Sequence, residues 1–205
     1  MPAILATKLG MTQRFMEDGS VERVTVLEAG PCPVTALRTA ERDGYEAVQL
    51  AFGATTEKRL SKAERGHLAR AGVGPMRHLV ELRGELEGVQ VGESVTVDRF
   101  QVGERVKVAG ISKGKGFQGT IARHGFKRGP KTHGSHNVRG PGSIGAAATP
   151  SRVFKGVRMA GHGGARRATQ RGLRVIAIEP ERNLLLLRGA VPGARGGLVE
   201  VRGDA

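Results

Sequence analysis

The chain has 205 residues and a formal net charge of +14, with 39% hydrophobic residues, 32 glycines, one tyrosine and no tryptophan. This length allows one ordinary domain, or a domain with a long insertion, whose core rests on aliphatic side chains. A positive surplus of this size opposes compaction and favours a polyanionic partner. No apolar run approaches the about 20 residues of a membrane span, so a spanning helix is excluded and nucleic acid is the expected partner.

In chain order, the predicted elements are mostly short strands. Runs rich in Val, Leu and Ile alternate with Gly, Pro and Asp, a pattern typical of strands joined by turns. The predicted strands cover residues 21–27, 34–38, 45–52, 76–82, 94–98, 105–109, 173–178, 184–188 and 198–202. The acidic turn at 17–19 suits a hairpin, and Ser61 with Glu64 fits the capping box of one helix. The pattern therefore predicts a mainly β fold, either a barrel or a sandwich.

Two features bear on the cellular compartment. Residues 1–11 lack the apolar core of a signal peptide. Cys32 is the single cysteine, so it has no partner for an internal disulfide, which fits a reducing compartment. Its setting between Pro31 and Pro33 indicates a small buried residue rather than a reactive thiol. We therefore expect a cytoplasmic protein.

The charge is unevenly distributed. Residues 105–178 contain no Asp or Glu but hold 16 Lys or Arg and four His, whereas the rest holds 17 Lys or Arg against all 19 acids. We expect a β-rich body of residues 1–112 that is completed by residues 172–205. Residues 113–171 then form a basic arm. The arm is rich in Gly and poor in apolar residues, so it should be mobile alone and become ordered when phosphates neutralise it.

The cationic and imidazole side chains of the basic arm are the predicted RNA-binding residues, because Arg grips phosphate bidentately, Lys adds point charge and His stacks or donates. The set is Lys113, Lys115, Arg123, His124, Lys127, Arg128, Lys131, His133, His136, Arg139, Arg152, Lys155, Arg158, His162, Arg166, Arg167 and Arg171. The glycines expected where the backbone approaches RNA closely are Gly114, Gly116, Gly119, Gly142, Gly145 and Gly161. Phe117, Phe126 and Phe154 are candidates for stacking on bases or for packing on the body.

A dinucleotide site is a competing interpretation, since residues 114–119 match the pattern G-x-G-x-x-G. That site needs a helix after the glycines and an acid about 20 residues further on. Gly125, Gly129 and Pro130 are expected to interrupt any helix, and the next acid is Glu179. The better interpretation is backbone lying close to phosphates. A nucleotide-dependent enzyme and a DNA-compacting protein nevertheless stay open as alternatives.

Metal binding and catalysis have little support in the sequence. His133 and His136 lie close together, but no Cys, Asp or Glu in the basic arm completes the usual four zinc ligands. A nucleophile needs an adjacent base and an orienting carboxylate, and the arm contains no carboxylate. We therefore predict no metal, no cofactor and no enzymatic activity.

The amino-acid sequence of the basic segment resembles that of a known protein family. Residues 111–120 (ISKGKGFQGT), 132–135 (THGS), 141–145 (PGSIG), 149–150 (TP) and 155–161 (KGVRMAG) are similar to the arm of bacterial large-subunit ribosomal protein L3. The body agrees at residues 10–12 (GMT), 43–45 (DGY), 66–67 (GH), 71–72 (AG) and 189–193 (GAVPG), in the same order and with matching spacing.

The resemblance implies a translation-protein-type β-barrel body with a small α/β insertion at about residues 55–92, and a long basic loop extending towards the peptidyl-transferase centre. It implies direct binding to large-subunit ribosomal RNA near its 3′ end, a role early in subunit assembly, contacts with neighbouring large-subunit proteins, and no catalytic activity. Two positions depart from the family pattern. Ala146 stands where many relatives carry a Gln that is methylated, and His124 stands where a Trp is often found.

Overall fold

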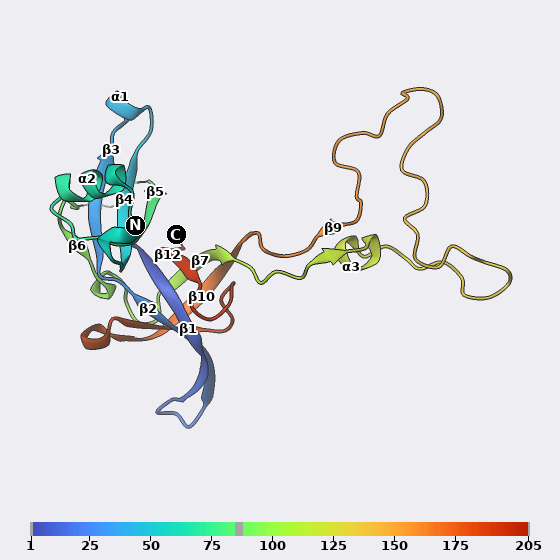
Figure 1. Ribbon diagram of the computed structural model, residues 1–205. Helices are drawn as coiled ribbons and strands as arrows, with labels where there is room; N and C mark the ends of the chain where they lie inside the picture. The colour runs from blue at the N-terminus through green and yellow to red at the C-terminus, as the bar shows by residue number, and fades with distance from the viewer. Residues whose placement is uncertain (1, 85–87, 205) are drawn as a thin grey trace. The chain divides into compact units, whose positions relative to one another are not determined.

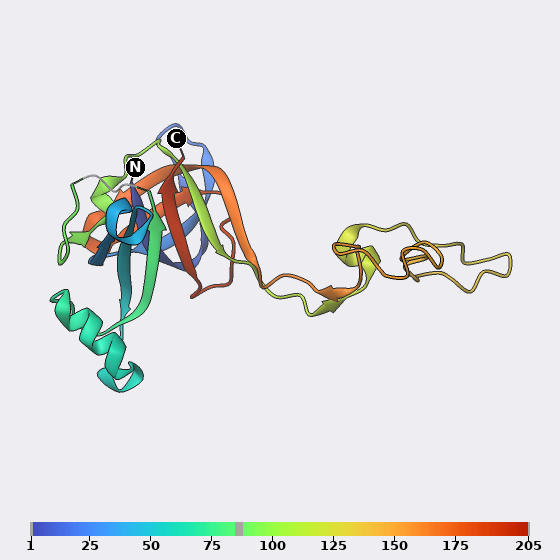
Figure 2. The ribbon, with the colours of Figure 1, turned by 90° about the horizontal axis from the view of Figure 1, so that it is seen from above.

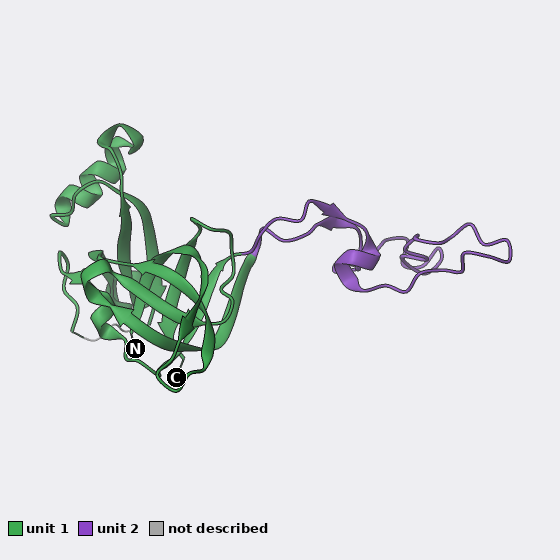
Figure 3. Ribbon diagram, turned by 90° about the horizontal axis from the view of Figure 1, so that it is seen from below, with its two compact units in different colours: residues 1–111, 167–205 green, residues 112–166 purple. Residues whose placement is uncertain are grey.

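The computed structural model describes residues 2–84 and 88–204, and it divides the chain into two compact units (Figure 3). Residues 1–111 and 167–205 belong to the first, which we call the barrel unit. Residues 112–166 make up the second, which we call the inserted unit. The sequence predicts a basic arm at residues 113–171, but a barrel strand begins at Arg167. Residues 167–171 therefore belong to the barrel unit.

Six antiparallel strands close into a barrel in the order β1–β12–β7–β10–β11–β2 (Figure 1). Their bounds are β1 Ala3–Phe15, β2 Val21–Ala29, β7 Arg105–Ile111, β10 Arg167–Glu179, β11 Leu184–Arg188 and β12 Leu198–Gly203. Figure 2 shows β12 and β7 side by side, the red and yellow-green strands. The closed barrel confirms the predicted fold class, and closure leaves no unpaired edge among these six strands.

A second antiparallel sheet in the barrel unit has the order β5–β4–β3–β6. Its strands are β3 Cys32–Arg38, β4 Ala47–Ala54, β5 Met76–Arg83 and β6 Ser94–Val95. The helical segments of this unit are α1 Ala40–Asp43, α2 Lys62–Arg70 and the 3-10 turns η1 Glu57–Arg59, η2 Val97–Arg99 and η3 Pro180–Arg182. The predicted capping box of α2 is confirmed, because Ser61 accepts from the Glu64 amide and Glu64 reaches back to the Ser61 amide. The α/β insertion is predicted at about residues 55–92, but the sheet also contains β3 and β4, which lie earlier in the chain.

The strand predicted at 94–98 is wrong in its second half. Only Ser94–Val95 pairs as a strand, and Val97–Arg99 forms a 3-10 turn. The Thr96 hydroxyl donates to the Asp98 carboxylate at 2.9 Å, and the Phe100 amide donates to the Val97 carbonyl. Local hydrogen bonds of this kind offer the backbone an alternative to the sheet ladder. The β-branched run therefore ends as a turn.

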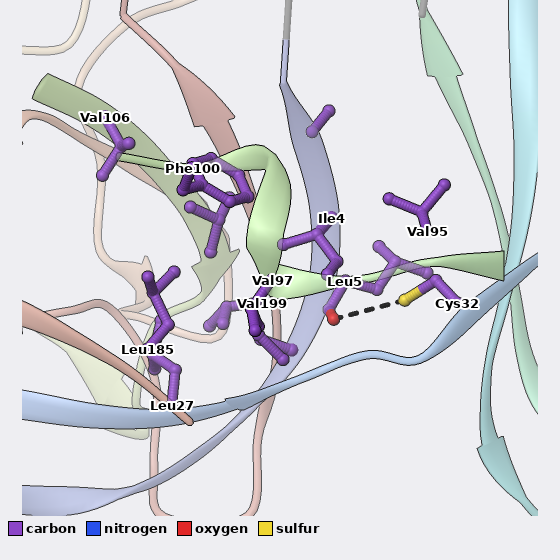
Figure 4. Close-up of a cluster of buried hydrophobic side chains, with 14 of the residues drawn as sticks. Ile4, Leu5, Leu27, Cys32, Val95, Val97, Phe100, Val106, Leu185 and Val199 are labelled. Carbon is purple, nitrogen blue, oxygen red and sulfur yellow. Dashed lines mark hydrogen bonds between the residues drawn. The ribbon is translucent and has the colours of Figure 1, made fainter. Parts of the chain in front are cut away.

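The larger of the two hydrophobic clusters found among the described residues of the barrel unit forms its core (Figure 4). Along β7, the buried Val106 and Val108 alternate with the more accessible Arg105 and Lys107, as the two-residue period of a strand requires. In Figure 4 the side chain of Phe100, just after η2, lies among barrel side chains. The interior is therefore filled mainly by aliphatic side chains that pack against one another.

Cys32 is fully buried in this core, which confirms the prediction of a small packed residue. Its Sγ donates to the Leu5 carbonyl at 3.4 Å, drawn as the dashed line in Figure 4. Burial raises the pKa of the thiol to about 12. The thiolate is therefore negligible at neutral pH, and the residue is chemically inert in the folded protein.

Candidate nucleic-acid interface

The inserted unit begins as two chain segments held together by backbone hydrogen bonds. The Ser112 amide donates to the Arg166 carbonyl at 2.9 Å, and the Lys115 amide donates to the Gly163 carbonyl at 2.8 Å. Strand β8 (Phe117–Gln118) then pairs with β9 (Gly161–His162). These contacts make an ordered base for the inserted unit.

Close packing at this base depends on glycine. Gly164 has φ of +67°, and a Cβ added there would collide with the Lys113 carbonyl oxygen. Gly161 leaves room for the Arg123 guanidinium, whose Nη1 would lie 2.9 Å from an added Cβ. Gly161 was predicted to allow close approach of RNA, but the space beside it is occupied by this side chain of the same unit. Gly116, Gly119 and Gly142 have open space where a Cβ would lie, so their faces stay accessible.

A short helix, α3 (Thr120–His124), follows the glycine-rich residues 114–119. The prediction that glycines would prevent any helix here is therefore wrong. Gly125 adopts the left-handed conformation, with φ of +72°, and its amide donates to the Ile121 carbonyl. Glycine at this position ends a helix rather than preventing it. With five residues and no acid before Glu179, the segment still lacks the ribose-binding carboxylate of a dinucleotide site.

The end of α3 is tied to the returning chain. Arg123 Nη1 donates to the Met159 carbonyl at 2.7 Å, and His124 Nε2 lies 3.0 Å from the same oxygen. The His124 and Phe126 rings form a tilted pair with centroids 6.1 Å apart. Arg123 and His124 are both half-buried. These two predicted RNA-binding residues therefore also hold the inserted unit together.

Residues 125–160 form a long irregular loop, drawn in purple in Figure 3. All nine of its predicted RNA-binding side chains are exposed: Lys127, Arg128, Lys131, His133, His136, Arg139, Arg152, Lys155 and Arg158. Gly129 donates its amide to the Val138 carbonyl at 3.0 Å, which closes one lobe of the loop. Arg152 lies over the Phe154 ring, with its Cζ 5.7 Å from the centroid.

Five predicted RNA-binding side chains gather around one hollow of about 400 Å³ at the base of the inserted unit. They are Lys113, Lys115, Arg123, His162 and Arg166. The buried backbone of Gly163 lines the same hollow. A hollow rimmed by cations and floored by glycine backbone has the size and charge to receive phosphate groups.

No carboxylate within the inserted unit balances these charges. Its sequence holds 11 Lys or Arg and no Asp or Glu. The ion pairs found among the described residues all lie in the barrel unit. The inserted unit is therefore a concentrated source of positive potential.

The last two predicted residues, Arg167 and Arg171, lie on barrel strand β10 rather than in the inserted unit. Together with them, Lys107 of β7 and Arg202 of β12 line a further hollow. Sequence reasoning did not select Lys107 and Arg202. The sequence signal that could have indicated them is the alternation of polar and apolar residues along their strands. Lys107 lies two residues from Arg105, and Arg202 lies two residues from Glu200.

Within the described ranges, no three His, Cys, Asp or Glu side chains are grouped as a metal ion would require. No helix in the described part of the chain is long and apolar enough to cross a bilayer.

Fold and charge together define a class: a β-barrel protein carrying an acid-free cationic insertion between two of its strands. The family model of ribosomal protein L3 matches residues 85–183. The large ribosomal subunit protein uL3 of Acidothermus cellulolyticus is 57% identical over 201 residues, covering 97% of this chain and 90% of that protein. The uL3 proteins of Thermosynechococcus vestitus and Synechococcus elongatus are 53% and 51% identical over 199 residues, covering 97% of this chain and 94% and 93% of theirs. The chain therefore belongs to the uL3 family of large ribosomal subunit proteins.

Proposed function

We propose that this protein is a structural constituent of the large ribosomal subunit that binds large-subunit ribosomal RNA directly. The observation that supports this function most strongly is the charge of the inserted unit. It contains 11 Lys or Arg and no Asp or Glu, and the cationic side chains of its loop are exposed. Each phosphate that meets one of these cations releases condensed counterions, which favours binding. Family membership supports the same function, since the relatives are large-subunit proteins by name.

The proposed contacts to RNA are of three kinds. Exposed Arg and Lys side chains of the loop meet phosphates between RNA segments. The hollow at the base of the inserted unit receives further phosphates. Phe117, 79% exposed, and Phe154, 55% exposed, are apolar rings in a cationic setting, where stacking on unpaired bases is favourable.

The proposed position of the protein in the ribosome rests on the family resemblance. We propose that the protein binds near the 3′ end of the RNA, acts early in subunit assembly, and directs its inserted unit towards the peptidyl-transferase centre. Neighbouring large-subunit proteins pack on the barrel unit, and the protein resides with the ribosome in the cytoplasm. It contributes no catalytic group, because the RNA performs the chemistry.

Sedimentation tests this function directly. A lysate of the source cells is centrifuged through a sucrose gradient, and the protein is followed by mass spectrometry. We expect it to comigrate with large subunits, to remain there after a moderate-salt wash, and to be stoichiometric with other large-subunit proteins. Recovery mainly at the top of the gradient would contradict the proposal.

A further inference from the structure

The outer face of three neighbouring barrel strands carries four cations that lie outside the inserted unit. Lys107 of β7 and Arg202 of β12 are directly paired residues of the sheet. Arg167 and Arg171 lie on β10, on the other side of β7. We call these four residues the barrel cation face. Together with Thr169 and Glu200 they line a hollow of about 260 Å³.

Strand geometry directs these side chains outward. On β7 and β12, successive side chains point to opposite faces of the sheet. Since Val106, Val108, Val199 and Val201 are buried, the residues between them, which include Lys107, point outward, and so does Arg202 next to Val201. On β10, the pairing register with β7 shifts between Gln170 and Leu173. A bulge at such a shift re-aims side chains, and Arg171, which lies within it, is exposed.

One carboxylate stands among the four cations. Arg167 grips Glu200 through two hydrogen bonds of 2.7 Å, and Arg202 Nη2 approaches the same carboxylate at 3.4 Å. Glu200 thereby holds two guanidinium groups in fixed orientations, each with N–H donors left over. Among the described residues, neither Lys107 nor Arg171 has a carboxylate within 4 Å. The face keeps a surplus of three positive charges.

The lining of this face favours nucleic acid over protein. Among the described residues that line the hollow, Ala109 is the one apolar residue. Protein–protein interfaces have an apolar, aromatic-rich centre, whereas nucleic-acid interfaces are polar and strongly cationic. We propose that the barrel cation face is a second contact surface for the RNA backbone, with phosphates meeting Lys107 and Arg171 while Glu200 acts as a positioning residue for Arg167 and Arg202. The inference rests on the RNA binding proposed above and extends it from the inserted unit to the barrel.

The test compares two full-length double variants that remove the same charge. K107Q/R171Q alters the face, whereas K58Q/R59Q alters two exposed cations on η1 outside it. Affinity for large-subunit ribosomal RNA purified from the source cells is measured by filter binding between about 50 and 200 mM KCl. We expect K107Q/R171Q to bind about tenfold more weakly at mid-range salt and to lower the salt slope by about two. K58Q/R59Q should leave the slope within about half a unit of the unaltered protein.

Three results would overturn the inference. One is an unchanged affinity and slope for K107Q/R171Q, which would leave an acidic protein segment as the better ligand. The second is an equal loss in K58Q/R59Q, which would reveal a general charge effect. The third is a loss of RNA affinity in the loop variant R128Q/K131Q, measured in parallel, with none in K107Q/R171Q. That result would support RNA binding by the inserted unit and contradict RNA binding by the barrel. If K107Q/R171Q does not fold, R171Q alone serves, with an expected slope change of about one.

Glu200 has its own test, because the positioning role and simple electrostatics predict opposite signs. E200Q removes a negative charge, so electrostatics alone would strengthen RNA binding. Loss of the fixed guanidinium orientations should instead weaken it, by about threefold, with E200D closer to the unaltered protein. Stronger RNA binding by E200Q would overturn the positioning role.

Discussion

Arg167 reaches across strand β7 to Glu200 on β12, where Nη1 and Nη2 each lie 2.7 Å from one carboxylate oxygen. The pair links two strands that do not neighbour each other, since β7 lies between β10 and β12. Arg167 is also the first residue after the inserted unit. The ion pair therefore anchors the returning chain to the barrel.

The first prediction concerns acid stability. Burial alone would raise the pKa of Glu200, but hydrogen bonds and charge from Arg167, with Arg202, hold it below its ordinary value. A carboxyl with a lower pKa in the folded state stabilises the protein above its unfolded-state pKa, and this contribution disappears as pH falls through the folded-state pKa. At pH 7, Glu200→Gln should lower the free energy of unfolding by about 1–2 kcal/mol, because half-exposed Arg167 limits the effect.

Urea unfolding of both proteins at several pH values checks this. The difference between them should be constant above about pH 5 and shrink towards about pH 3. Other carboxyls with lowered pKa, such as Glu81, change both proteins equally and cancel in the difference. A difference independent of pH would contradict the role assigned to the Glu200 charge.

The second prediction concerns a buried lysine. Lys8 is 8% exposed, and its Nζ donates to the carbonyls of Val191 at 2.6 Å and Gly193 at 3.2 Å. Lys8→Met keeps the side-chain length but leaves these carbonyls without that donor, so we expect a loss of about 2–4 kcal/mol in the free energy of unfolding. Lys58→Met, at an exposed position, should change it by less than about 0.5 kcal/mol. Equal stability of the two variants would refute the structural role of Lys8.

The third prediction concerns Cys32. Because the thiol is fully buried and its pKa is raised to about 12, it should not react with a thiol reagent at pH 8 in the folded protein. Modification should occur only as molecules unfold, and rapidly once denaturant is added. Absorbance of the released reagent group follows the reaction. Fast labelling of the native protein would show that the core around Cys32 is open.

The fourth prediction concerns the base of the inserted unit. Gly164→Ala places a methyl group against the Lys113 carbonyl in a conformation that disfavours side chains. The hydrogen bond from the Lys115 amide to the Gly163 carbonyl and the one from the Gly163 amide to the Gly116 carbonyl should open. Amide exchange at Lys115 and Gly163 should then accelerate by at least about tenfold. Melting of the barrel unit should not change. Gly119→Ala is the control, since a Cβ there meets open space; equal exchange in both variants would contradict the packing argument.

Sequence reasoning located most of the fold because alternating apolar residues mark strands locally. Residues 184–188 and 198–202 were predicted within a residue of β11 and β12. Closure of the barrel depends on pairing between β1 and β12, which lie at opposite ends of the chain. No local pattern specifies such a pairing. The sequence does not predict the role of Gly125 for a related reason: glycine can either interrupt or end a helix, and only the backbone conformation distinguishes the two.

The boundary of the basic arm was harder to predict than its existence. The acid-free run extends to Ile178, so composition does not mark the point where pairing with β7 begins. Arg167 and Arg171 therefore resembled loop cations. Their pairing with β7, which brings Lys107 and Arg202 beside them, depends on tertiary contacts that lie beyond local sequence patterns.

The central claim is that the inserted unit supplies most of the RNA affinity. The most direct measurement compares the full chain with a chain in which residues 113–165 are replaced by a short glycine-serine linker between β7 and β10. Binding to large-subunit ribosomal RNA is titrated from about 50 to 200 mM salt. We expect the shortened protein to melt cooperatively but to bind at least about 10³-fold more weakly. Its salt slope should fall by about six or more, as expected for 6–10 lost phosphate contacts. A folded, shortened protein that kept the full affinity and slope would contradict the account.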